Sequence, residues 1–298
     1  MIVSASYKTD IPAFYGDWFM ARLDAGFAAQ ANPYGGPPSR VSLAPADVDG
    51  FVFWTRNAGP FRAHLDQVAR RGFPFVVQIT ITGYPRALDA ATVAAQAAVA
   101  QARELAAAFG RHAVVWRYDP VVFSSLTPAG WHRRAFARLA GDLAGAVDEV
   151  VLSVMQPYRK TARNMDRAAA AHGFDWWDPA ADEKRALLAD LTAVARDHGM
   201  RATLCDQPEL RVDGLGEARC VDAERLGQVA GRPLDVPRKP HRPTCGCWAS
   251  RDIGAYDSCP QGCAYCYAVA SPAAAKRRLA AHDPAGEFLV APPGGGGT

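Results

Sequence analysis

The sequence lacks the features that would place the protein in a membrane or in a strongly charged complex. No stretch approaches the ~20 consecutive apolar residues that a membrane-spanning helix requires. The first residues, MIVSASYKTD, have neither the charged start nor the apolar run of a signal peptide. The formal net charge of +3 gives no strong argument for nucleic acid as a partner. We therefore expect a cytoplasmic protein without a membrane partner.

The expected compartment decides how the seven cysteines are interpreted. In a reducing compartment, closely spaced cysteines indicate metal binding or catalysis more than disulfides. The hydrophobic fraction of 49% is typical of a globular protein with a sizeable core. The length of 298 residues allows one large domain or two ordinary ones.

Six β-rich runs alternate with helical patterns over residues 1–231. This alternation predicts parallel βαβ units, and right-handed crossovers then give a partial barrel or an open doubly wound sheet. The open-sheet alternative lacks its main signature, because no Gly-rich loop follows the first strand. We predict an α/β fold, a partial (β/α)6 TIM-type barrel. The six expected strands are residues 2–6, 51–54, 75–81, 114–118, 150–154 and 201–205.

The composition changes after residue 231. Residues 232–244 contain four prolines and five basic residues, which predicts an extended linker. Five of the seven cysteines fall between residues 245 and 266, so we expect residues 245–285 to form a cysteine cluster segment packed on the barrel. Residues 286–298 end in PPGGGGT and are predicted to be a disordered tail.

The strongest motif is formed by Cys259, Cys263 and Cys266, with the spacing C-x3-C-x2-C. Cysteine thiolates are the usual ligands of iron–sulfur clusters. Three ligands from one loop would leave the fourth iron of a 4Fe-4S cluster open for a cofactor or substrate. Structural zinc is the alternative, but zinc usually takes four ligands arranged in C-x2-C pairs.

This spacing resembles the motif of the radical S-adenosylmethionine superfamily. In that superfamily the open iron binds S-adenosylmethionine, and an aromatic residue before the last cysteine packs near the adenine. Tyr265 occupies that position here. The superfamily motif follows the first strand, whereas this one lies near the C-terminus. A segment of 27 residues (232–258) can extend roughly 90 Å at ~3.3 Å per residue, enough to reach the C-terminal face of a barrel.

Further segments carry a resemblance along most of the chain. The whole sequence resembles an uncharacterised bacterial family, a domain of unknown function, that has a radical-SAM-like cysteine cluster at the C-terminus. The resemblance implies an iron–sulfur segment on the barrel but no defined reaction. The residues that carry it are 4–12 (SASYKTDIP), 52–57 (VFWTRN), 116–120 (WRYDP), 245–247 (CGC) and Tyr267.

A second set of cysteines comprises Cys205, Cys220, Cys245 and Cys247. Four thiolates could hold a second 4Fe-4S cluster or a zinc ion. The alternative is two buried structural cysteines and a reactive C-x-C pair. The sequence does not show which of these cysteines meet.

Polar residues at the ends of the predicted strands are the remaining candidates. Arg117 and Asp119 close the fourth strand and are our candidate catalytic residues. Thr55 and Asn57 follow the second strand and are candidate cofactor ligands. In a barrel such residues point into the mouth of the active site. The alternative is ordinary loop chemistry, such as helix capping and surface ion pairs.

Three functions follow from these features. The first is an enzyme that receives an electron from a reducing donor, cleaves S-adenosylmethionine at a 4Fe-4S cluster and starts radical chemistry on an unknown substrate. The second is an iron–sulfur protein that transfers electrons or senses redox state without that cleavage. The third is a zinc-stabilised binding protein. Basic residues at 238–242 and 276–278 would serve a nucleic-acid partner, although a solvated linker and helix face explain them better.

Overall fold

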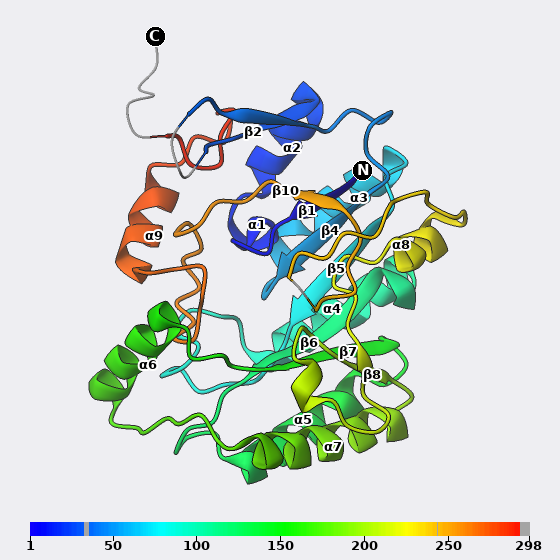
Figure 1. The fold of residues 1–298 in the computed structure, drawn as a ribbon. Helices are drawn as coiled ribbons and strands as arrows, with labels where there is room; N and C mark the ends of the chain where they lie inside the picture. Colours follow the sequence, from blue (N-terminus) through cyan, green and yellow to red (C-terminus); the bar gives the residue numbers. More distant parts are fainter. Residues whose placement is uncertain (33–35, 243, 293–298) are drawn as a thin grey trace.

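A parallel β-sheet forms the centre of the protein in the computed structural model, which describes residues 1–32, 36–242 and 244–292 (Figure 1). The strand order is β10-β1-β4-β5-β6-β7-β8-β9, and every neighbouring pair is parallel. All six predicted strands are present, which confirms an α/β fold with a large parallel sheet. The strands are β1 (Ile2–Ala5), β4 (Gly50–Thr55), β5 (Phe75–Thr80), β6 (Val114–Val121), β7 (Glu149–Val154), β8 (Arg201–Leu204), β9 (Gly216–Glu217) and β10 (Ser250–Asp252).

Helices flank the sheet, and a small antiparallel hairpin of β2 (Phe27–Gln30) and β3 (Ser39–Ser42) lies outside it. The predicted Ala-rich helix is α4, which ends at Gly110, where a positive φ of 88° suits glycine. The helices are α1 (Ile11–Phe14), α2 (Gly16–Ala25), α3 (Arg62–Arg70), α4 (Ala95–Phe109), α5 (Ala129–Leu143), α6 (Arg159–His172), α7 (Ala181–Asp197), α8 (Ala223–Ala230) and α9 (Pro272–Ala280), with short 3-10 turns at Gly59–Phe61, Arg111–Ala113 and Pro208–Leu210.

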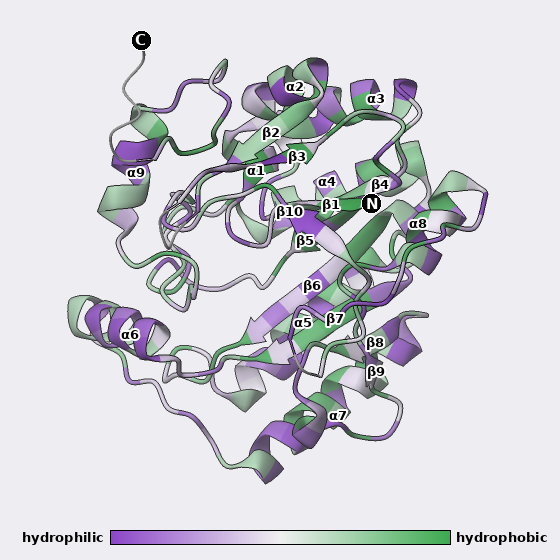
Figure 2. Cartoon of the chain, turned by 45° about the horizontal axis from the view of Figure 1, so that its top comes forward, coloured by the Kyte–Doolittle hydropathy of each residue, from purple (hydrophilic) through white to green (hydrophobic). Residues whose placement is uncertain are grey.

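The sheet is buried on both faces, which is why its strands are near-continuous apolar runs. On one face, Phe53 and Trp116 pack into the large core under the helices. Alternate residues point to the opposite face, where Val52, Val115 and Val151 form a second apolar cluster. Figure 2 shows the hydropathy of the chain, with much of the sheet in green and the outlying helix α6 largely purple.

The predicted linker does not run as an extended connection in its described part. Arg238 and Trp248 form an antiparallel bridge, and the Ala249 N–H donates to the Pro237 carbonyl at 2.9 Å. Val236 and Trp248 are buried against the second apolar cluster, so the chain doubles back over that face of the sheet. Burial of these two side chains explains why a proline-rich segment packs here.

The predicted disordered tail is wrong for its first residues. Leu289 is only 3% exposed, and Phe288 bridges Ala29 of β2. The Trp18 indole N–H donates to the Gly286 carbonyl at 3.0 Å. Burial of Leu289 and the hydrogen bond from Trp18 hold this part of the chain against the rest of the protein. Residues 293–298 lie outside the described residues. No helix in the described part of the chain is both long and apolar enough to cross a bilayer.

Candidate functional site

A cavity of about 490 Å³ lies at the C-terminal ends of the parallel strands. Its walls include residues at or just beyond the ends of β1, β4, β5, β6, β7 and β8, so all six predicted strands contribute to it. All seven cysteines line this one cavity, and all are free thiols. The two cysteine sets separated in the sequence therefore share one chamber. The strand-end lining includes Ser6, Trp54, Thr80, Asp119, Ser153 and Cys205.

The loop that carries Cys259, Cys263 and Cys266 is docked on residues 88–91. Ala264 N–H donates to the Leu88 carbonyl at 2.8 Å, and Ala91 N–H donates to the Gln261 carbonyl at 2.9 Å. This orange segment runs from β10 past α6 to α9 in Figure 1, and the Asn164 side-chain amide of α6 donates to the Val269 carbonyl at 2.9 Å. The loop is thus held at several points from different parts of the chain.

Gly262 is required by the geometry of this loop. Its φ of 73° is in the left-handed region, and a Cβ there would lie 3.1 Å from the Ala90 side chain. Both the backbone conformation and the close approach therefore favour glycine between the first two cysteines.

The environment of the three loop thiols favours their neutral form. Burial, with the charges of Asp10 and Cys266 nearby, raises the pKa of Cys259 to about 12. Burial is also the main cause of the raised pKa values of Cys263 and Cys266. A bound metal centre reverses this preference, because a coordinating thiol is deprotonated by the charge of the metal.

Tyr265 lines the cavity but its hydroxyl is turned into the protein. The hydroxyl donates to Asp89 at 2.6 Å and accepts a hydrogen bond from the Arg56 guanidinium. Arg56 in turn pairs with Asp89 at 2.6 Å. The ring meets Tyr84 edge to face at a centroid distance of 5.7 Å. Because its hydroxyl is engaged by Asp89 and Arg56, Tyr265 has its ring left to contact a cofactor.

Asp10 joins the start of the chain to the cysteine loop and was not predicted. Its carboxylate accepts hydrogen bonds from the Gln261 amide at 2.9 Å, the Arg56 N–H at 2.9 Å and the Ala13 N–H at 3.0 Å. Burial raises the pKa of Asp10. An aspartate followed by Ile-Pro is a signature of a helix N-terminus, so the sequence could have predicted that Asp10 caps a helix. Nothing in the sequence indicated that Asp10 also contacts the cysteine loop.

The second cysteine set is gathered at the part of the cavity over β6 and β8. The sulfur atoms of Cys205 and Cys220 are 3.7 Å apart, and the Cys247 thiol also hydrogen-bonds Cys220. Hydrogen bonds from Cys205 and Cys247, together with Arg117, hold the pKa of Cys220 well below its usual range. The bond to Cys220 raises the pKa of Cys205. The Cys245 sulfur accepts two backbone N–H groups.

The predicted catalytic residues Arg117 and Asp119 both line the cavity and bind each other. The Arg117 Nε donates to Asp119 at 2.8 Å, while its Nη1 donates to the Gln78 side-chain oxygen Oε1 at 3.2 Å and to the Cys220 sulfur at 3.1 Å. Ser153 donates a further hydrogen bond to Asp119. Arg117 is 5% exposed, so its main contacts are with this polar layer and with the second cysteine set.

The two predicted cofactor ligands at the end of β4, Thr55 and Asn57, have different positions. Thr55 is buried, lines the cavity, and accepts a hydrogen bond from the Asn57 N–H at 2.9 Å. Asn57 is not part of the cavity wall. Its side-chain oxygen accepts from Gln101 at 2.8 Å and from the Gly59 N–H at 3.3 Å. The structure therefore brings Thr55 to the site and commits Asn57 to local capping.

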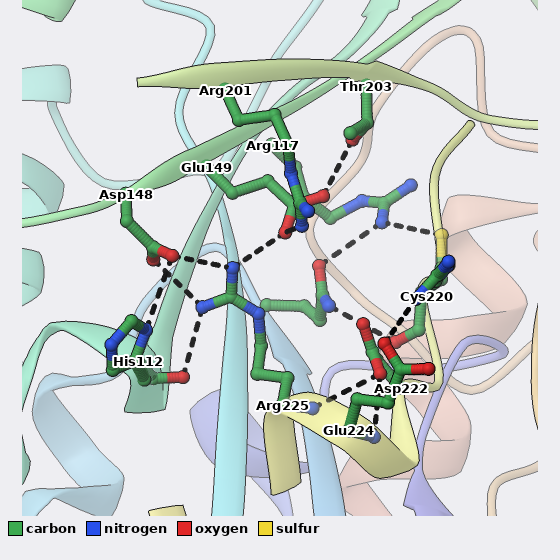
Figure 3. Close-up of polar contacts among 12 residues, drawn as sticks. His112, Arg117, Asp148, Glu149, Arg201, Thr203, Cys220, Asp222, Glu224 and Arg225 are labelled. Carbon is green, nitrogen blue, oxygen red and sulfur yellow. Dashed lines mark hydrogen bonds and ion pairs between the residues drawn. The ribbon is translucent and has the colours of Figure 1, made fainter. Parts of the chain in front are cut away.

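A buried ion network ties α8 to the start of β7. Arg225 is 4% exposed and contacts Asp148 at 2.9 and 3.0 Å and Glu149 at 2.7 Å. Figure 3 shows how Arg225 reaches from α8 to these carboxylates, with Cys220 and Arg117 in the same view. The Gln78 amide donates to the Cys220 carbonyl at 3.1 Å. The backbone of Cys220 is thereby tied to the sheet.

The thiols are gathered without being closed around a single ion. Within residues 1–32, 36–242 and 244–292, no three His, Cys, Asp or Glu side chains form a group already set to hold one ion. An iron–sulfur cluster places each cysteine on its own iron, so it does not require that its ligands meet at one point.

Comparisons with known proteins give a family but no activity. A family model described as a domain of unknown function (DUF1848) matches residues 2–268. No curated protein matches the chain. No solved structure matches it either.

Proposed function

The chain belongs to the DUF1848 family, a domain of unknown function, and we propose that it is a radical S-adenosylmethionine-type enzyme. The observation that carries the proposal is the position of Cys259, Cys263 and Cys266. These three thiols line a cavity at the C-terminal ends of six parallel strands. In barrel enzymes that end of the strands carries the active site.

The sheet topology supports a partial (β/α)6 TIM-type barrel as the frame of this enzyme. The six central strands follow chain order, β1-β4-β5-β6-β7-β8, and all are parallel. In this view β9 and β10 are short additions at the two edges, and the cysteine loop is an iron–sulfur segment packed across the strand ends.

The donor set fits a 4Fe-4S cluster with an open iron. Cys259, Cys263 and Cys266 would bind three irons, and the loop that carries them contains no fourth cysteine. When bound, the reduced cluster would supply one electron to S-adenosylmethionine at the fourth iron, giving methionine and a 5'-deoxyadenosyl radical. An external one-electron donor would restore the cluster. Raised thiol pKa values are compatible with this set, because metal binding removes the protons.

The chain's own residues would position the loop and exclude water. Asp10 holds Gln261 beside the cysteines, while Arg56 and Asp89 fix the Tyr265 hydroxyl. This leaves the Tyr265 ring and the buried Thr55 as candidate contacts for the cofactor. The cavity of about 490 Å³ is within the size range of small-molecule sites. A chamber of this size favours an enzyme over a protein that only transfers electrons.

An anaerobic reconstitution experiment tests the proposal. Wild-type protein reconstituted with iron and sulfide should carry about four irons at this site. With a chemical reductant and S-adenosylmethionine, it should release methionine and 5'-deoxyadenosine, measured by liquid chromatography. The variant Cys259→Ser, Cys263→Ser, Cys266→Ser should release neither. Stoichiometric zinc with no iron in anaerobically prepared wild-type protein would contradict the proposal.

A further inference from the structure

We propose that Cys205, Cys220, Cys245 and Cys247 form a second metal site, in which Cys205 and Cys220 bind the same tetrahedral ion. The four residues come from the end of β8, the segment before α8, and the C-x-C pair before β10. This site does not depend on the proposed enzyme function. It would be present in a protein that never cleaves S-adenosylmethionine.

The distance between two sulfur atoms carries the shared-ion part of the proposal. The Cys205 and Cys220 sulfur atoms are 3.7 Å apart. Two thiolates at the ~2.3 Å Zn–S distance on one tetrahedral ion lie ~3.8 Å apart. In a 4Fe-4S cluster each thiolate binds a different iron, so its ligand sulfurs are farther apart. The spacing therefore matches one zinc ion, or one iron of a 2Fe-2S cluster, better than a cubane.

Donors around the sulfur atoms suit thiolate ligands. The Cys245 sulfur accepts from the His241 N–H at 3.0 Å and the Arg242 N–H at 3.3 Å. Arg117 Nη1 is 3.1 Å from the Cys220 sulfur. Such outer contacts orient metal ligands and offset part of their negative charge. Backbone N–H groups also donate to Cys259 and Cys266 of the loop, so both cysteine sets carry contacts of this kind.

The backbone at these positions is already fixed by the fold. Cys205 N–H donates to the Leu152 carbonyl at 2.9 Å, and the Cys220 carbonyl accepts from Gln78 at 3.1 Å. The Cys247 carbonyl accepts from the Lys239 N–H at 3.1 Å. These contacts hold the backbone of three of the four residues in place before any metal binds. A preformed backbone of this kind is what a metal site on rigid elements needs.

Cobalt binding tests the second site without the first. The probe is Co²⁺ added anaerobically to reduced, metal-free protein that carries Cys259→Ser, Cys263→Ser and Cys266→Ser. This variant should bind one Co²⁺ per chain, with the visible bands of tetrahedral cobalt and a thiolate charge-transfer band. Adding Cys205→Ser and Cys220→Ser to this variant should abolish both the visible bands and the charge-transfer band. Circular dichroism checks that each variant is folded.

A measurement on the wild-type chain covers the case in which the variants unfold. Reduced wild-type protein is treated with iodoacetamide with and without Zn²⁺, and each cysteine is followed by peptide mass spectrometry. Zn²⁺ should protect Cys205 and Cys220 in parallel, at the same Zn²⁺ concentration.

Specific outcomes would overturn this inference. One is a folded loop variant that binds no cobalt, and another is cobalt binding that survives loss of Cys205 and Cys220. Four irons in the loop variant after reconstitution with iron and sulfide would show a cubane and refute the shared ion. A Cys205–Cys220 disulfide in metal-free protein, with no protection by Zn²⁺ after reduction, would assign the pair to redox chemistry. Because the loop cysteines are absent throughout the cobalt experiment, none of its results depends on S-adenosylmethionine cleavage.

Discussion

Replacing Tyr265 with phenylalanine tests whether the cysteine loop is fixed through the tyrosine hydroxyl. The change removes a 2.6 Å hydrogen bond to Asp89 and one from Arg56, while Arg56 and Asp89 still pair at 2.6 Å. Hydrogen bonds to charged groups contribute ~1.5–3 kcal/mol, and the retained ion pair limits the loss. We therefore expect Tyr265→Phe to lower the free energy of unfolding by ~2 kcal/mol.

Tyr267→Phe is the matched control for this experiment. The Tyr267 hydroxyl also donates at 2.6 Å, but to the Tyr7 carbonyl, and the residue is 40% exposed. Because water can replace that bond, we expect a cost below ~1 kcal/mol. The assay is urea unfolding of reduced, metal-free protein followed by tryptophan fluorescence. Equal costs for the two variants would refute the anchoring role. A double-mutant cycle with Asp89→Asn would assign the coupling to this pair.

Further predictions concern the buried network, a histidine and the loop glycine. Arg225→Met should lower the free energy of unfolding by ~3 kcal/mol, because it removes the buried cation shared by Asp148 and Glu149. The carboxylates keep their contacts with His112, Arg201 and Thr203. Arg201→Met, at a side chain that is 58% exposed, should cost at most ~1 kcal/mol, and similar urea midpoints for the two variants would contradict this. Burial lowers the pKa of His132 to about 4. The unfolded chain, in which the pKa of a histidine is ~6.5, therefore binds a proton that the folded protein does not, and the free energy of unfolding should fall by ~2 kcal/mol between pH 7 and pH 5. This fall should be absent in His132→Asn. The same pH dependence in His132→Asn as in the wild type would contradict the prediction. Gly262→Ala should reduce the iron retained after reconstitution, since both φ and the 3.1 Å approach to Ala90 disfavour a side chain; full retention, measured by a colorimetric iron assay, would show that the loop adapts.

The central strands could be predicted from the sequence because they are buried on both faces. Runs such as residues 75–81 and 150–154 are mostly apolar, with only Gln78, Thr80 and Ser153 as polar members, and such runs are typical of strands buried on both faces. The edge strand β10 (Ser250–Asp252) has no apolar pattern, and its pairing with β1 is set by tertiary contacts such as that of Asp252 with Ser4 at 2.8 Å. Short edge strands of this kind are not visible in periodicity.

The spacing of the three cysteines singled out their loop as a candidate site, but the sequence did not predict the residues that hold the loop in place. Arg56, Asp89 and Tyr265 meet from positions 33 to 209 residues apart, and no local pattern encodes such a meeting. The same limit explains Asn57. Its place after a strand predicted a cofactor ligand, whereas in the structure its side-chain oxygen accepts from the Gly59 N–H and the residue lies outside the cavity wall. The role of the Tyr265 ring at a cofactor stays a prediction.

Electron paramagnetic resonance of the reduced protein tests the central claim most directly. The claim is that Cys259, Cys263 and Cys266 hold a 4Fe-4S cluster whose open iron binds S-adenosylmethionine. Protein carrying Cys205→Ser and Cys220→Ser is reconstituted, reduced with dithionite, and measured with and without S-adenosylmethionine, so that signals from the second site do not overlap. We predict the signal of a reduced 4Fe-4S cluster that shifts when S-adenosylmethionine is added. A signal that does not change at saturating S-adenosylmethionine, or no cluster signal at all in folded protein, would contradict the account.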